Sequence, residues 1–162
     1  MAVKKPMKKT VKQAVVEKTL VEHLAGVLSD TYVLAIKTHG YHWNVTGPLF
    51  PQLHSFFEQQ YSALFEAADE LAERIRALGH FAPPSATAFL VQTVVREAVT
   101  GKLTAASMLQ DLLKSQQLVR NRVEEARAVA DRDGDKATED MLIGRLEDHD
   151  KMIWMIRSQL DA

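Results

Sequence analysis

Residues 51–79 read PQLHSFFEQQYSALFEAADELAERIRALG, and this stretch decides the fold. Its apolar residues recur at steps of three and four, which places them on one side of an α-helix. They are Leu53, Phe57, Tyr61, Leu64, Ala68, Leu71, Ile75 and Leu78. Gly79 is a good helix terminator. The stretch therefore predicts a long amphipathic helix from about Pro51 to Leu78.

Three further segments show the same helical spacing, over about residues 14–40, 103–131 and 137–160. A break at Gly47-Pro48 and a turn at residues 133–135 make two of the links short, so those neighbouring helices should be antiparallel. The link over residues 79–102 is long and carries an apolar patch at residues 89–91 that predicts one or two helical turns. An all-α four-helix bundle with one long crossover containing a short helix is the ferritin-like topology.

The composition of the 162 residues is that of a single globular domain without cysteine. Any metal must therefore be held by nitrogen and oxygen ligands. The apolar runs are shorter than a membrane span, and the N-terminus has no apolar signal segment, so we expect no membrane association and a cytoplasmic location.

The charge is uneven although the net charge is only −1. Residues 1–12 form a basic arm without acids, ahead of a bundle over residues 13–162. The arm carries Lys4, Lys5, Lys8, Lys9 and Lys12. Removing these from the 20 basic residues leaves 15 against 21 acidic ones, so the body attracts cations while the arm suits a polyanion. A solvated terminus is the alternative interpretation of the arm.

The helix over residues 51–78 holds two pairs of metal-ligand side chains at i, i+4 spacing, His54/Glu58 and Asp69/Glu73. All four fall within about 100° of one helix face, but His54 and Asp69 are about 22 Å apart along the axis. One metal cannot reach both within a chain. A copy of this helix running antiparallel across a two-fold axis would place His54/Glu58 of one subunit opposite Asp69/Glu73 of the other, giving two equivalent sites.

Imidazole with carboxylates suits Fe(II), Mn(II) or Zn(II), and iron would permit redox chemistry. Antiparallel packing also brings His42 near His54, with Trp43 as an apolar wall that would limit water. The alternatives are solvated acids with a partly buried histidine, and a His-Trp pair that packs the end of the bundle. The Glu-x-x-His motif of an intra-bundle di-iron site is absent from the chain.

Two stretches carry a family resemblance, KTHGYHWNVTG at residues 37–47 and the segment from Phe50 to Ile75 that holds both ligand pairs. They resemble the signature of the Dps family, the DNA-binding proteins from starved cells, and residues 150–155 are similar to the last helix of that family. The resemblance implies a hollow homo-dodecamer with ferroxidase centres at its two-fold interfaces. Iron (Fe2+/Fe3+) would be oxidised there, preferably by hydrogen peroxide, and stored as ferric mineral, which protects DNA.

The resemblance also implies the site residues. His42 and His54 would ligate from one subunit and Asp69 and Glu73 from its partner, while Glu58 would hold a second metal or a bridging water. Trp43 resembles the tryptophan close to the centre, which quenches radicals or simply packs. His39 is either a neighbour of the ligands or a surface residue, and the other histidines are ordinary helix or loop residues.

Iron entry and DNA binding are the remaining implications. Acids at three-fold pores would be Asp131, Asp135 and Asp140, although the same residues suit an acidic turn and the first turn of a helix. The basic arm would bind DNA without sequence preference, which would make the protein nucleoid-associated. Two alternatives stay open: a DNA-compacting structural shell with a vestigial metal site, and a helical assembly that is inert or holds zinc or manganese.

Overall fold

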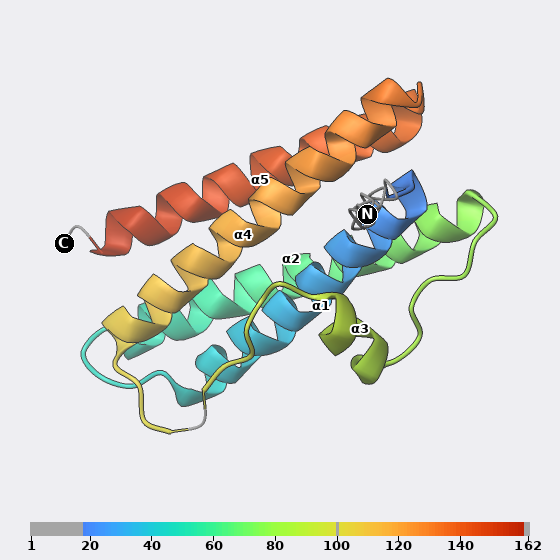
Figure 1. The fold of residues 1–162 in the computed structure, drawn as a ribbon. Helices are drawn as coiled ribbons and strands as arrows, with labels where there is room; N and C mark the ends of the chain where they lie inside the picture. Colours follow the sequence, from blue (N-terminus) through green and yellow to red (C-terminus); the bar gives the residue numbers. More distant parts are fainter. Residues whose placement is uncertain (1–17, 100, 161–162) are drawn as a thin grey trace, which may run out of the picture.

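The structure is a computed structural model that describes residues 18–99 and 101–160. Four long helices run side by side in pairs, and a short fifth helix lies on the crossover between the second and fourth (Figure 1). The helices are α1 (Leu20–Asn44), α2 (Phe50–Ala77), α3 (Ala86–Gln92), α4 (Ala105–Arg132) and α5 (Lys136–Leu160). The predicted bundle, its long crossover and the short helix within it are all confirmed.

Local sequence explains where the helices begin. Thr19 caps α1 by accepting a hydrogen bond from the backbone N–H of Glu22, whose carboxylate in turn accepts one from the backbone N–H of Thr19. Ser85 and Thr104 cap α3 and α4 in the same way, through their hydroxyl groups. Pro51 lies in the first turn of α2, where a missing N–H costs nothing.

The first helix ends later than its hydrophobic pattern predicts. It continues to Asn44, so His42 and Trp43 lie in its last turn instead of in a loop. The backbone then turns at Gly47, whose φ of 109° favours glycine, and Pro48 prevents the helix from continuing. This short turn sets the last turn of α1 beside the first turns of α2. The predicted start near residue 14 and the arm at residues 1–12 lie outside the described residues.

The core is formed by the apolar stripes of α1, α2, α4 and α5. Phe57, Leu53, Leu71 and Ile75 of α2 are fully buried, as its spacing predicts. Burial of such side chains contributes about 1.5–3 kcal/mol each to folding. Polar residues also enter the core, and three of them, Gln60, Gln116 and His149, lie on different helices.

The crossover is held to the bundle by one buried carboxylate, that of Asp30 in α1. It accepts hydrogen bonds from the Thr93 hydroxyl at 2.8 Å and from the Val94 N–H at 2.7 Å, and it pairs with Arg122 of α4 at 3.3 Å. Arg122 also donates to the carbonyl of Gln92. These contacts fasten the end of α3 to α1 and α4.

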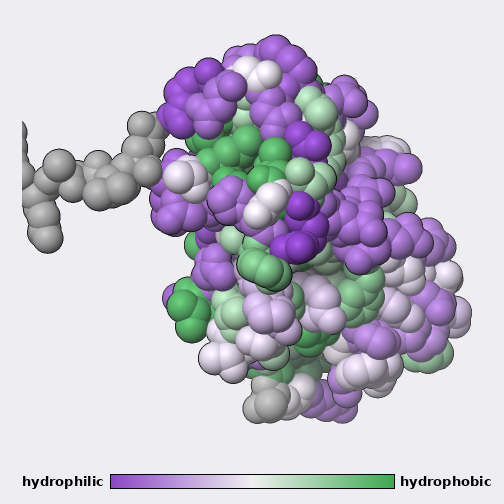
Figure 2. Space-filling view, turned by 90° about the vertical axis from the view of Figure 1, so that its right-hand side faces the viewer, coloured by the Kyte–Doolittle hydropathy of each residue, from purple (hydrophilic) through white to green (hydrophobic). Residues whose placement is uncertain are grey.

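The surface is polar at the end of the bundle where α4 turns into α5. Hydrophilic residues cover most of this face, with a smaller apolar area among them (Figure 2). Within the described residues, no helix combines the length and apolar character that a membrane crossing requires.

Candidate metal centre

His42 at the end of α1 and His54 at the start of α2 lie face to face. Their rings are stacked with centroids 3.7 Å apart. The Nδ1 of His42 is 2.8 Å from the carbonyl oxygen of His54, and the Nδ1 of His54 is 2.9 Å from the carbonyl oxygen of His42. The predicted proximity of the two residues is confirmed, and it comes from the tight turn between the helices.

These reciprocal hydrogen bonds determine which ring nitrogen is available. A carbonyl oxygen only accepts, so both Nδ1 atoms must carry hydrogen. In the neutral imidazole, the lone pair therefore lies on Nε2 of each ring. Metal-binding histidines commonly have this arrangement, in which a backbone carbonyl holds one nitrogen and orients the ring. The pair can therefore offer two nitrogen ligands, one Nε2 from each ring.

Aromatic rings surround the pair, but not as the sequence predicts. Tyr61 stands edge-on to His42 at 5.3 Å, and Phe50 lies 5.1 Å from His54. The ring of Trp43 packs on His39 at 4.1 Å and is 66% exposed, so it forms no wall over His42 within one chain. His39 also stacks on Tyr61 at 4.0 Å, which makes it a packing neighbour of the pair.

The three acids assigned to the site are all exposed on α2. Glu58, Asp69 and Glu73 make no hydrogen bond or ion pair with any other residue that the structure describes. Nor does one chain bring three or more histidine, aspartate or glutamate side chains together for a metal, within residues 18–99 and 101–160. A complete set of ligands would thus need residues from another chain, as the spacing of about 22 Å along α2 requires.

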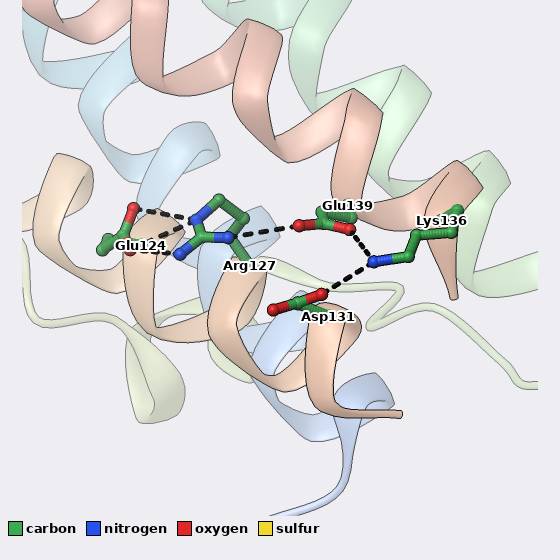
Figure 3. Close-up of polar contacts among 5 residues, drawn as sticks. All are labelled: Glu124, Arg127, Asp131, Lys136 and Glu139. Atoms are coloured by element: carbon green, nitrogen blue, oxygen red, sulfur yellow. Dashed lines mark hydrogen bonds and ion pairs between the residues drawn. The ribbon is translucent and has the colours of Figure 1, made fainter. Parts of the chain in front are cut away.

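The acids assigned to the pore differ in how they are engaged. Asp131 is paired with Lys136 at 2.7 Å, and Lys136 also binds Glu139, which Arg127 links to Glu124 (Figure 3). The hydrogen bond from Lys136 holds the pKa of Asp131 below its ordinary value. In this network, Asp131, Glu139 and Glu124 are engaged by the two basic residues Lys136 and Arg127.

The other two acids assigned to the pore, Asp135 and Asp140, lie in different surroundings. Burial alone would raise the pKa of Asp135, but hydrogen bonds from Thr138 and Arg74 outweigh it and leave the pKa below its ordinary value. Asp140 is exposed and makes no hydrogen bond or ion pair within the described part of the chain. Of the three acids, Asp140 is the one left free to attract a cation.

One buried polar cluster was not predicted from the sequence. His149 of α5, expected from the sequence to be an ordinary helix or loop residue, is 1% exposed and hydrogen-bonds Gln116 of α4 at 2.6 Å. Burial, with a smaller effect from Arg145, lowers the pKa of His149 to about 3. Gln60 of α2 is also buried beside them. The signal for this cluster is a glutamine within the apolar stripe of α2, between Phe57 and Leu64.

Comparisons with known proteins agree with this architecture. Residues 21–162 match the ferritin-like domain family. A DNA protection during starvation protein of Brevibacillus brevis is 34% identical over 149 residues, which span 89% of this chain and 99% of that protein. A low temperature-induced protein of Nostoc sp. is 36% identical over 83% of this chain and 76% of its own length. The crystal structure of Dps from Staphylococcus aureus superposes with a TM-score of 0.84 at 36% identity, covering 87% of this chain and 94% of that one.

The bundle and its domain match define a ferritin-like protein. The identity shared over most of the chain is more specific, and the chain belongs to the Dps family within the ferritin-like superfamily.

Proposed function

We propose that this protein is a ferroxidase and iron store whose metal centre is shared between two subunits. One observation carries the proposal: the carbonyl hydrogen bonds of His42 and His54 leave both Nε2 atoms free as ligands. The free acids Asp69 and Glu73 lie on the same face of α2, too far away to serve the same ion within a chain. Two copies of α2 that pair in antiparallel fashion would complete two centres at once.

The surface beside the histidines supports pairing of two copies. A groove between α1 and α3 is lined by Ile36, Trp43 and Leu90, which are 50%, 66% and 47% exposed. Apolar side chains gathered in this way are typical of a protein–protein contact. A second copy would cover Trp43 and set it against the assembled centre. Membership of the Dps family supports the dodecameric shell of the proposal.

Fe(II) is the substrate of the proposed reaction. Two Fe(II) ions each give one electron to one hydrogen peroxide molecule, whose O–O bond breaks to form two hydroxide ions, so two Fe(III) ions form and no hydroxyl radical is released. Imidazole nitrogen and carboxylate oxygen are suitable ligands for Fe(II) and Fe(III). A Dps of Vibrio cholerae is described as a member of a superfamily of ferritin-like diiron-carboxylate proteins, which favours iron over zinc. Asp140 is the acid we assign to iron entry.

The proposal is tested by Fe(II) oxidation with stoichiometric hydrogen peroxide in the purified assembly under anaerobic conditions. Wild type is compared with Asp69→Ala/Glu73→Ala. We expect rapid oxidation in wild type, near two Fe(II) for each peroxide, and its loss in the variant. The matched control is Glu66→Ala/Glu70→Ala, which removes the same charges at the same spacing from a neighbouring face of α2. Equal rates in all three proteins would show that Asp69 and Glu73 do not form the centre.

A second candidate function rests on the basic arm. Five lysines and no acid in residues 1–12 suit contact with DNA phosphates, and several arms on one shell would act together. In that case the protein would compact DNA and its metal site would be vestigial. Unchanged oxidation rates in the experiment above, together with DNA binding, would favour this alternative.

A further inference from the structure

The end of α1 is tied to α4 by one carboxylate, that of Asp111. Its Oδ2 accepts a hydrogen bond from the hydroxyl of Tyr41 at 2.7 Å and pairs with the ammonium of Lys37 at 2.6 Å. Lys37 also donates to the hydroxyl of Ser115 at 3.0 Å. Tyr41 and Lys37 lie one turn apart on α1, as Asp111 and Ser115 do on α4, so two turns of each helix face each other.

This network lies mostly inside the protein. Tyr41, Lys37 and Ser115 are all buried, whereas the carboxylate of Asp111 reaches the surface. A buried hydroxyl or ammonium group has lost its hydration, so its hydrogen-bond partners are costly to remove. Within the described residues, the hydroxyl of Tyr41 has one partner, Asp111. The network therefore holds the side chain of Tyr41 in one position against α4.

Tyr41 also belongs to the backbone turn that ends α1. Its carbonyl oxygen accepts a hydrogen bond at 2.9 Å from the N–H of Val45, the residue that caps the helix. The carbonyl of His42 comes next and is among the last four of the helix, which have no partner within it. The Nδ1 of His54 donates to this carbonyl instead, at 2.9 Å. The bond that orients His54 thus depends on where the last turn of α1 lies.

Tyr41 and His42 hold this turn from two sides. They are consecutive residues, so their side chains leave the helix about 100° apart. Tyr41 contacts α4 and His42 contacts α2, and α1 packs against both of these helices. The two hydrogen bonds between His42 and His54 connect α1 to α2 only. A contact with α4 fixes the rotation of the turn about the helix axis, and the hydroxyl of Tyr41 makes that contact beside His42.

We propose that Tyr41 is a positioning residue for the His42–His54 pair, and that its hydrogen bond to Asp111 sets the direction of the free Nε2 of His42. Tyr41 acts through the backbone of α1, since its own hydroxyl is turned towards α4. The inference rests on the proposed metal centre, because the direction of Nε2 matters only if this atom binds a metal.

The test is a titration of the iron-free assembly with Co(II) under anaerobic conditions, followed by the visible absorption of the bound ion. Co(II) lies next to Fe(II) in its affinity for nitrogen and oxygen ligands. The binding that is lost in His54→Ala belongs to the centre. Tyr41→Phe removes one oxygen atom and keeps the aromatic ring and the ion pair of Asp111 with Lys37. We expect its dissociation constant for Co(II) at the centre to rise about tenfold, which is typical for the loss of a group that orients a ligand.

Two control variants separate positioning from general packing. Tyr32→Phe makes the same change on α1, at a tyrosine whose hydroxyl forms no hydrogen bond within the part of the chain that the structure describes. It should bind Co(II) as wild type does. Ser115→Ala removes a hydrogen bond of Lys37 from the same network. It should lower the temperature of unfolding but leave the affinity for Co(II) unchanged, because Tyr41 keeps its bond to Asp111.

The possible outcomes are distinct. A dissociation constant in Tyr41→Phe that equals that of wild type would overturn the inference and leave the metal centre standing. Equal losses of affinity in Tyr41→Phe and Ser115→Ala would also overturn it, because the effect would then follow the packing of α1 on α4. Co(II) binding that is the same in wild type and His54→Ala would overturn the metal centre itself, and this inference with it.

Discussion

His149 shows how one buried side chain couples stability to pH. It is neutral in the core with a pKa near 3, whereas an exposed histidine has a pKa near 6.5, so the unfolded chain binds its proton more readily. Its contribution to stability is therefore fully present above pH 6.5 and is lost progressively as the pH falls from 6.5 towards 3.

We expect His149→Gln to weaken this pH dependence. Glutamine does not titrate and can keep a hydrogen bond to Gln116, so the variant should lose less free energy of unfolding than wild type between pH 6.5 and pH 4.5. In wild type, the protonation of His149 should lower the free energy of unfolding by on the order of a few kcal/mol per subunit between pH 6.5 and pH 3. Urea unfolding at a series of pH values measures it. His80→Gln, at an exposed position in the loop after α2, is the control and should follow wild type. If the free energy of unfolding had the same pH dependence in all three proteins, His149 would not be its source.

At the scale of the elements, the crossover depends on a close approach between α1 and α4. A Cβ at Gly26 would lie 2.0 Å from Nη2 of Arg122. Arg122 is held by Asp30 and by the carbonyl of Gln92, so moving it would leave a fully buried carboxylate without its charged partner. Glycine at position 26 therefore permits the contact that fastens α3.

We expect Gly26→Ala to destabilise the protein by about 1–3 kcal/mol because the hydrogen bonds of Arg122 are disrupted. Hydrogen exchange should also speed up at the backbone of residues 92–95, where the crossover is attached. Gly144→Ala on α5 is the matched control, since a Cβ there meets no atom within 4 Å. It should be neutral or raise the stability by about 0.5–1 kcal/mol through helix propensity. Equal effects of the two substitutions would show that Arg122 moves aside without cost.

At the scale of the whole molecule, a shared centre predicts complementation between two inactive proteins. His54→Ala and Asp69→Ala subunits each spoil both centres of their own dimers. A mixed dimer would contain one centre with all of its ligands and one centre that lacks both His54 and Asp69.

Random co-assembly in equal amounts should therefore restore about a quarter of the wild-type centres. The initial rate of peroxide-dependent Fe(II) oxidation measures this recovery. The two parent proteins mixed without disassembly are the control. Hybrids that stay as inactive as their parents would exclude a centre shared across the two-fold axis.

The basic arm leads to a second prediction at this scale. If the basic arm binds DNA as proposed, deletion of residues 1–12 should abolish retardation of DNA at low salt, because it removes all five lysines that would contact phosphates. In the full-length protein, binding should fall steeply as salt rises. Fe(II) oxidation should not change, since no proposed ligand lies in the arm. Retardation by the truncated shell that equals that of the intact one would assign DNA binding to another surface.

The sequence by itself determined the helices, their order and the faces they bury, because a 3.6-residue periodicity is a local property of the chain. It also predicted that His42 would meet His54, since a short turn between two helices leaves few arrangements. The candidate ligand pairs of α2, His54/Glu58 and Asp69/Glu73, could be found by counting residues along one helix.

Only the tertiary structure decided which histidine nitrogens are free, because the hydrogen bonds at Nδ1 depend on backbone carbonyls of the neighbouring helix. It likewise turned Trp43 onto His39, left Asp140 as the free acid of the α4–α5 turn, and brought Gln60, Gln116 and His149 to one cavity. These three polar residues lie far apart along the chain, and no local pattern links them. Their proximity follows from the packing of three helices, which depends on all of the side chains between them.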